Sequence, residues 1–236
     1  MRHFEQQLEE LLGKVVEMAR LAETMIDAAV KTLITREESM CAAVFTTEDQ
    51  VNALQVEVDD LAIKLTVLLQ PAARDARFLF MASRIGGELE RIADQSINIC
   101  QNAHHVLAAP PLRPIVDIPV MADTAQKMLR DAITAMTHRD VALANTVLEE
   151  EKKVDAQRDT IFRTLLTYMM ADPATIQRAL SLILIARNLE RIGDHATNIA
   201  EEVIYWVQGR DVRHNAGGRA VRRGPPAPGE PVKSEI

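Results

Sequence analysis

Oxygen-bearing side chains recur every four residues at two places in the chain, and this spacing suggests metal chemistry. The two sets are Glu90, Asp94 and Asn98, and Glu190, Asp194 and Asn198. Residues four apart lie on one side of a helix, drifting by about 40° per step. Two carboxylates at this spacing repel each other unless a cation lies in front of them. We therefore predict a cation-binding stripe on each of two helices, with a solvated acidic face as the alternative.

Both stripes belong to an internal repeat. Residues 88–99 and 188–199 match at seven of twelve positions with a constant offset of 100. The shared residues in the first copy are Leu89, Glu90, Arg91, Ile92, Asp94, Asn98 and Ile99. Such self-similarity predicts two structural units of the same kind, each carrying one stripe.

A further acidic series precedes the second stripe, with carboxylates again four residues apart. Neighbouring helices of a bundle pack about 8–10 Å apart, so this series could face the second stripe across one groove. The expected ligands of this second-repeat site are Asp155, Asp159, Glu190 and Asp194, with Glu151 and Asn198 as additional ones. Several carboxylate oxygens suit hard or borderline divalent or trivalent metal ions.

The corresponding site in the first half has fewer acids. Aligning Val51 with Val154 places Asn52 and Val56 where the second half has its two aspartates. The first-repeat candidates are therefore Glu90 and Asp94, with Glu48 and Asn98 as additional ligands. We expect an intact cluster in the second half and a depleted one in the first.

Composition favours helices and excludes several classes of protein. Apolar residues make up 47% of the 236-residue chain and aromatic residues only 3%, which disfavours a sheet protein. The net charge of −7 argues against a nucleic-acid-binding protein. The two cysteines have no disulfide-framework spacing and are expected to be buried in a reducing compartment. With neither a signal peptide nor a membrane-spanning apolar run, the chain is expected to be cytoplasmic.

Helical periodicity predicts an all-α fold of two tandem antiparallel three-helix bundles related by a pseudo-two-fold internal repeat. The expected helices span residues 4–34, 46–69, 74–107, 120–138, 140–170 and 173–207. We assign residues 1–108 to the first repeat, 109–119 to a proline-rich linker, 120–214 to the second repeat and 215–236 to a disordered tail.

The periodicity also assigns directions to individual side chains. Ile63, Leu68 and Leu166 are expected to point inwards with the other apolar residues of their helices. His195 follows Asp194 but lies about 100° around the helix from it, so we expect a surface histidine.

Four short motifs resemble those of the PhoU family of phosphate-specific transport accessory proteins. They are the repeated Leu-Glu-Arg-Ile-(Ala/Gly)-Asp, the stretch from Gln70 to Arg77, the Tyr-Met-Met-Ala-Asp-Pro of residues 168–173, and the Gly-Arg-Asp-Val-Arg-His of residues 209–214. The resemblance covers residues 1 to about 214. Ala93 replaces the motif glycine in the first copy, and Ala76 replaces a leucine.

The resemblance implies a regulator without catalytic activity. It implies metal clusters bound through acidic motifs, with iron or zinc as the metal and manganese, magnesium or nickel retained as alternatives. It also implies a homodimer or higher homo-oligomer, bound to the membrane only peripherally through its partners, with no nucleic acid involved. Those partners would be the ATPase subunit of the phosphate ABC transporter and the sensor histidine kinase of the phosphate two-component system.

We therefore expect a negative regulator of phosphate uptake and of phosphate-starvation gene expression. One alternative is a di-metal carboxylate enzyme, but that class uses Glu-x-x-His on two helices. Here Ala93 and Gly193 stand where those histidines would be. The other alternative is a purely structural helical adaptor whose acidic stripes are solvated.

Overall fold

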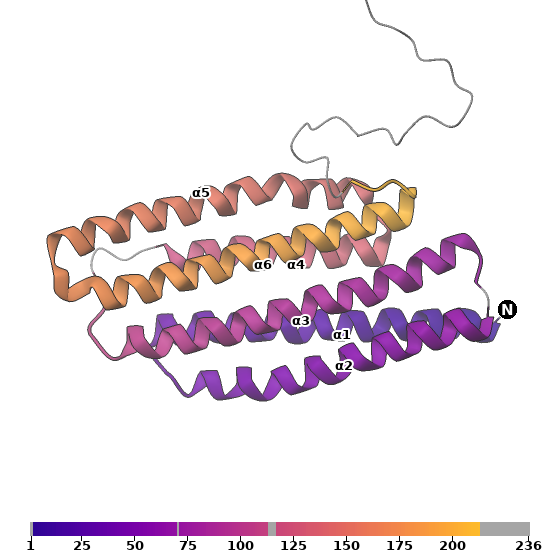
Figure 1. The fold of residues 1–236 in the computed structure, drawn as a ribbon, viewed down its shortest axis with the longest axis horizontal. Coiled ribbons are helices and arrows are strands. Elements are labelled where there is room, and N and C mark those ends of the chain that lie inside the picture. The colour runs from indigo at the N-terminus through magenta and orange to yellow at the C-terminus, as the bar shows by residue number, and fades with distance from the viewer. Residues whose placement is uncertain (1, 70, 113–116, 213–236) are drawn as a thin grey trace, which may run out of the picture.

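The computed structural model describes residues 2–69, 71–112 and 117–212, and it places them in six long helices (Figure 1). The helices are α1 (Arg2–Thr35), α2 (Met40–Leu69), α3 (Ala73–Leu107), α4 (Ile118–His138), α5 (Val141–Ala171) and α6 (Ile176–Gln208). A single 3-10 turn, η1 (Pro173–Thr175), connects α5 to α6.

The helices form two three-helix bundles, which confirms the predicted fold class. Helices α1–α3 pack on one another, as do α4–α6. The bundles meet where α3 and α6 pack along each other, and α1 adds a smaller contact with α4. In Figure 1, α3 and α6 lie side by side in the middle, with α2 and α5 on opposite edges. One continuous cluster of buried apolar residues runs through both bundles.

Helix α2 begins at Met40, so the predicted start at residue 46 was wrong. The hydroxyls of Thr46 and Thr47 donate to the carbonyl oxygens of Ala42 and Ala43, at 3.0 and 2.7 Å. These threonines therefore lie inside the helix and bond back to the preceding turn instead of capping a new one.

The second half follows the sequence signals more closely. Helix α4 begins at Ile118, two residues earlier than predicted, because Pro119 occupies the first turn, where its missing N–H costs nothing. Asp140 caps α5 by accepting a hydrogen bond from the backbone N–H of Leu143. Helix α6 ends at Gln208, and Gly209 follows it with a φ of 67°, the left-handed conformation that terminates helices.

One glycine in each repeat shows how the third helix of a bundle packs against the second. A Cβ atom at Gly86 would lie 3.5 Å from Val58, and one at Gly193 would lie 3.5 Å from Val154. Ala93, seven residues after Gly86 on α3, is the counterpart of Gly193. Because α2 and α3 are antiparallel, Ala93 lies opposite Val51, which is seven residues before Val58. This packing supports the alignment of α2 with α5 used to compare the two sites.

The apolar face of each repeated motif is turned into the core. Leu89, Ile92 and Ile99 are fully buried, as are their counterparts Leu189, Ile192 and Ile199. The acidic residues of both motifs therefore project from the other side of α3 and α6.

Several large apolar side chains face solvent, contrary to the prediction for Ile63, Leu68 and Leu166. They lie at equivalent places in the two repeats. The α2/α3 apolar surface contains Ile63, Val67 and Phe80, and the α5/α6 apolar surface contains Leu166, Met170 and Leu180. Periodicity alone did not separate these residues from the core, because each helix is apolar on more than one face.

The proposed tail, residues 215–236, and residues 113–116 of the linker lie outside the described part of the chain. Within the described part, none of the helices combines the length and apolar character needed to cross a bilayer.

Candidate metal-binding site

The second-repeat carboxylates gather around the guanidinium of Arg158. Its Nη1 atom is hydrogen-bonded to Oε1 of Glu190 and lies 3.6 Å from Oδ1 of Asp155. Its Nη2 atom donates to Oδ1 of Asp159 at 2.8 Å. Three of the four principal ligands expected here thus share one cation that belongs to the protein. The sequence interpretation missed this role, although Arg158 lies between the two aspartates in the sequence.

Two further carboxylates of the cluster, Glu151 and Asp194, have raised pKa values. Burial, with repulsion from Glu190 and Asp155, raises the pKa of Asp194 above its usual value. Burial, with repulsion from Asp194 and Asp155, likewise raises the pKa of Glu151. These interactions place Glu151, Asp155, Glu190 and Asp194 in one electrostatic group that Arg158 neutralises only in part.

The first-repeat group contains fewer carboxylates than the second-repeat group. Burial raises the pKa of Glu90, and repulsion from Asp94 and from Glu48 acts in the same direction. Asn98 is half-buried, and its backbone oxygen accepts a hydrogen bond from the side chain of Asn102. The structure therefore brings Glu48 close to the two motif carboxylates without adding a fourth acid.

A hollow of about 500 Å³ between α3 and α6 joins the two stripes. It is lined by Glu90, Arg91, Asp94, Gln95, Arg191, Asp194 and His195. Because both repeated motifs contribute to it, the two candidate sites open onto the same space at the junction of the bundles.

His195 is not the surface histidine that we expected. Its Nδ1 atom lies 2.7 Å from Oε2 of Glu88, and its side chain is only 14% exposed. The side chain of Asn198 donates to the same oxygen at 3.0 Å. Although burial opposes it, these hydrogen bonds hold the pKa of Glu88 below its usual value. His195 and Asn198 therefore join α6 to α3, and the amide of Asn198 is used away from the acidic cluster.

Two glutamates further along α6 extend the buried acidic region. Burial, with repulsion from Glu151 and Glu202, raises the pKa of Glu201 to about 7. Arg84 of α3 donates to Oε1 of Glu202 at 2.6 Å. Glu202 continues the four-residue series of Glu190, Asp194 and Asn198, but the sequence interpretation stopped at Asn198, and Glu201 lies outside that series.

The donor set can be compared with what a metal ion requires. Carboxylate oxygens are the ligands that hard cations take, and burial together with mutual repulsion raises the pKa of Glu151 and of Asp194. Yet in the described part of the chain no three His, Cys, Asp or Glu side chains are arranged to hold a metal ion. The type of donor atom therefore fits a metal ion, whereas the carboxylates of Glu190 and Asp159 are placed to bind Arg158.

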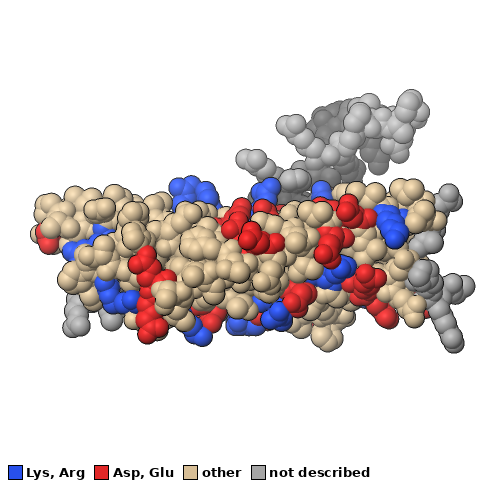
Figure 2. Space-filling view, turned by 90° about the horizontal axis from the view of Figure 1, so that it is seen from below, with Lys and Arg blue, Asp and Glu red and all other residues tan. Residues whose placement is uncertain are grey.

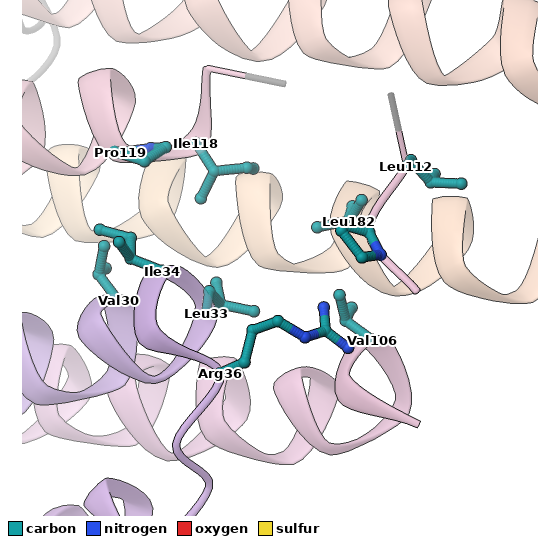
Figure 3. Close-up of a pocket in the computed structure, with 10 residues that line it drawn as sticks. Val30, Leu33, Ile34, Arg36, Val106, Leu112, Ile118, Pro119 and Leu182 are labelled. Atoms are coloured by element: carbon teal, nitrogen blue, oxygen red, sulfur yellow. The ribbon is translucent and has the colours of Figure 1, made fainter. Parts of the chain in front are cut away.

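A separate apolar cavity of about 400 Å³ lies where the ends of α1 and α3 meet the start of α4 (Figure 3). Arg36 at its edge donates to the carbonyl oxygens of Leu107 and Ala109, at 2.9 and 2.6 Å. Leu112 and Ile118 line the cavity, and the chain between them is partly outside the described residues. We therefore assign no ligand to it.

The surface charge has mixed signs. On the face shown in Figure 2, acidic and basic side chains are interspersed and form no continuous basic stretch. This distribution differs from the basic stripe typical of nucleic-acid-binding surfaces.

The model of the family described as the PhoU domain matches residues 15–103 and 118–203, one match in each bundle. The chain belongs to the PhoU family. It is 36% identical to a "Phosphate-specific transport system accessory protein PhoU homolog" of Pseudomonas putida, over 90% of this chain and 84% of the relative. It is 31% identical to the "Phosphate-specific transport system accessory protein PhoU" of Escherichia coli (strain K12), over 91% and 89%.

The fold is similar to that of a solved PhoU structure. The crystal structure of PhoU from Pseudomonas aeruginosa aligns with a TM-score of 0.84 and 35% identity, over 88% of this chain and all of that one. The resemblance inferred from the repeated motif is thus confirmed for both bundles of the PhoU fold.

Proposed function

We propose that this chain is an accessory regulator of phosphate transport that restrains phosphate uptake and phosphate-starvation gene expression. The observation that carries the proposal is the relationship to accessory proteins of the phosphate-specific transport system, which extends over about nine-tenths of the chain: 90% for the Pseudomonas putida relative. In this role it acts without catalysis, as an adaptor between the ATPase subunit of the phosphate ABC transporter and the sensor histidine kinase.

Two equivalently placed apolar surfaces support an adaptor role. The side chains of Ile63 and Val67 on one surface, and of Met170 and Leu180 on the other, are at least half exposed. Exposed apolar patches on a folded domain commonly mark interaction sites. A chain with one such surface in each repeat could bind two partners, or a partner and a second copy of itself.

We further propose that the second-repeat cluster binds a divalent or trivalent metal ion, with iron or zinc favoured. Glu151, Asp155, Glu190 and Asp194 would hold it, and the ion would neutralise carboxylates that now repel one another. The first-repeat group of Glu48, Glu90 and Asp94 has fewer donors and is expected to bind more weakly.

Transcription of phosphate-starvation genes tests the regulatory proposal. In a strain lacking this gene, those genes should be expressed at high phosphate, and the wild-type gene on a plasmid should silence them again. A deletion strain that keeps them silent at high phosphate would contradict the proposed function. Size measurements on the purified protein test the homodimer.

A purely structural adaptor is the second candidate, and the contacts of Arg158 favour it. A guanidinium that already pairs with Asp155, Asp159 and Glu190 removes part of the need for a metal. Metal analysis of protein purified without chelators or affinity metals separates the candidates. Stoichiometric metal supports the metal-binding adaptor, and its absence after incubation with iron or zinc supports the structural one.

A further inference from the structure

The outer face of the α5–α6 hairpin carries two rows of exposed apolar side chains. The row on α5 consists of Phe162, Leu166 and Met170, and the row on α6 consists of Ile176, Leu180 and Leu184. Residues four apart stay on one side of a helix, so each row is a stripe about 12 Å long. The described part of the chain leaves both stripes uncovered.

The two rows border a groove. A hollow of about 330 Å³ lies between α5 and α6, and its apolar lining comes from Phe162, Ile183 and Ala186. The carboxylates at the end of this hollow, those of Asp159 and Glu190, are the ones that Arg158 already binds. An apolar groove between two packed helices is the kind of surface on which an amphipathic helix lays its apolar side.

The free charges beside the groove are positive. Between residues 160 and 187 the one acidic residue is Asp172, whose side chain accepts a hydrogen bond from the backbone N–H of Ala174. Arg163, next to Phe162, donates to a backbone oxygen and not to a carboxylate. Arg187 lines the hollow and has no hydrogen-bond or ion-pair partner among the described residues. Two exposed guanidinium groups without a carboxylate favour a ligand that carries negative charge along its edges.

The equivalent face of the first repeat has different chemistry. The register of α2 with α5 places Asp59 and Asp60 where the second repeat has Phe162 and Arg163. The hydroxyl of Ser83 on α3 donates to Oδ1 of Asp59, so a hydrogen bond bridges α2 and α3 at the place where the hollow lies between α5 and α6. The two repeats share a fold, yet it is the second that combines an apolar groove with a basic edge.

We propose that the groove between α5 and α6 binds an acidic amphipathic helix of a partner protein. The apolar residues of that helix, at positions i, i+3 or i+4, and i+7, would cover the two apolar rows. Its Asp and Glu side chains would pair with Arg163 and Arg187. This proposal rests on the proposed adaptor function, and it names the chemistry of the partner that binds at the second repeat.

The charges also decide against other occupants. The same acidic helix would meet Asp59 and Asp60 at the first repeat and be repelled, so the two surfaces select different partners. Two copies of this chain that met through the groove would bring Arg163 and Arg187 of both copies together, and like charges oppose such contact.

Binding of two purified proteins to the full-length chain tests the proposal. They are the ATPase subunit of the phosphate transporter and the sensor kinase in lipid nanodiscs, each titrated separately. Met170→Asp is the test variant and Val67→Asp the matched control, because these residues are equivalent and are 80% and 69% exposed. One of the two proteins should bind the Met170 variant at least about tenfold more weakly and the Val67 variant as tightly as the wild type. Arg187→Glu should weaken the same complex, and by less at high salt.

A photo-crosslinking amino acid in place of Leu180 identifies the segment that occupies the groove. A crosslinked peptide with the expected apolar spacing and acidic edges supports the proposal. A crosslink to lipid, to a second copy of this chain or to a segment without that pattern would overturn it. Unchanged binding by the Met170 and Arg187 variants would also overturn it, while the adaptor function would stand. If neither protein binds the wild-type chain, the adaptor function fails and this proposal fails with it.

Discussion

Replacing Arg158 by glutamine tests how far this arginine neutralises the negative charge of the second-repeat cluster. The register of α2 with α5 places Gln55 at the equivalent position of the first repeat, so Arg158→Gln copies a residue that the same fold already accepts. The change removes one positive charge from contact with Asp155, Asp159 and Glu190 and leaves a shorter, uncharged polar side chain.

The metal-free protein should lose a modest amount of stability. The side chain of Arg158 is 33% exposed, so each ion pair is screened by water and contributes only about 0.2–1 kcal/mol. Three such contacts give a loss of roughly 1–2 kcal/mol in the free energy of unfolding.

The affinity for metal should rise in this variant, although the stability of the metal-free protein falls. Two unit charges at contact distance interact by about 1 kcal/mol in water and about 4 kcal/mol near a protein surface. Removing a cation that competes for the same carboxylates should therefore strengthen binding by at least about 1.4 kcal/mol, which is tenfold in Kd. Metal should then restore more than the stability that the substitution removed.

Calorimetric titration of chelator-treated protein with zinc, and manganese binding followed by electron paramagnetic resonance, measure the affinity. Arg163→Gln is the matched control. It makes the same charge change one turn further along α5, where the guanidinium donates to the backbone oxygen of Asp159. Equal or weaker binding by the Arg158 variant would refute the idea that this arginine competes with metal. An equal gain in the control would show that only net charge matters.

Other substitutions test the remaining features. Replacing Glu190 and Asp194 together by alanine should lower the bound metal measured by mass spectrometry while leaving the helical circular dichroism intact; unchanged metal content would remove both residues from the site. Gly193→Ala should stabilise the protein by about 0.5–1 kcal/mol in urea unfolding, because Ala93 already occupies the equivalent position and the added methyl would meet its nearest neighbour at 3.5 Å. The pKa of Glu201, about 7, lies above its unfolded value, so its favourable contribution is present below about pH 4.5 and is lost as the pH rises through 7. Glu201→Gln should therefore stabilise the chain by about 2 kcal/mol at pH 8 and by little at pH 4, and equal effects at both pH values would show that Glu201 titrates normally.

The architecture could be predicted because its signals are local and repeated. The apolar residues of the motif, such as Leu89 and Ile92, recur at helical spacing and are buried as expected. Asp140 and Gly209 mark helix ends through capping chemistry that acts within a few residues. The start of α2 was missed because Thr46 is equally suited to cap a helix or to bond back within one.

The site could be predicted only in part, because its geometry depends on contacts between helices. The four-residue spacing identified the carboxylates, but whether Arg158 points at them or at water is decided by the packing of α5 on α6. In the same way, His195 reaches Glu88 only because α3 and α6 pack together. The exposure of Ile63 also depends on which faces of α2 are covered by neighbouring helices.

The antiparallel packing of α3 along α6 makes the two bundles one stiff rod. Helix α3 has 35 residues, which corresponds to a length of about 50 Å. Because α3 and α6 begin at opposite ends of the rod, the two exposed apolar surfaces lie at opposite ends as well (Figure 1). The rod would hold two proteins bound at these surfaces at a fixed distance from each other, and it would not need to bend when either protein binds.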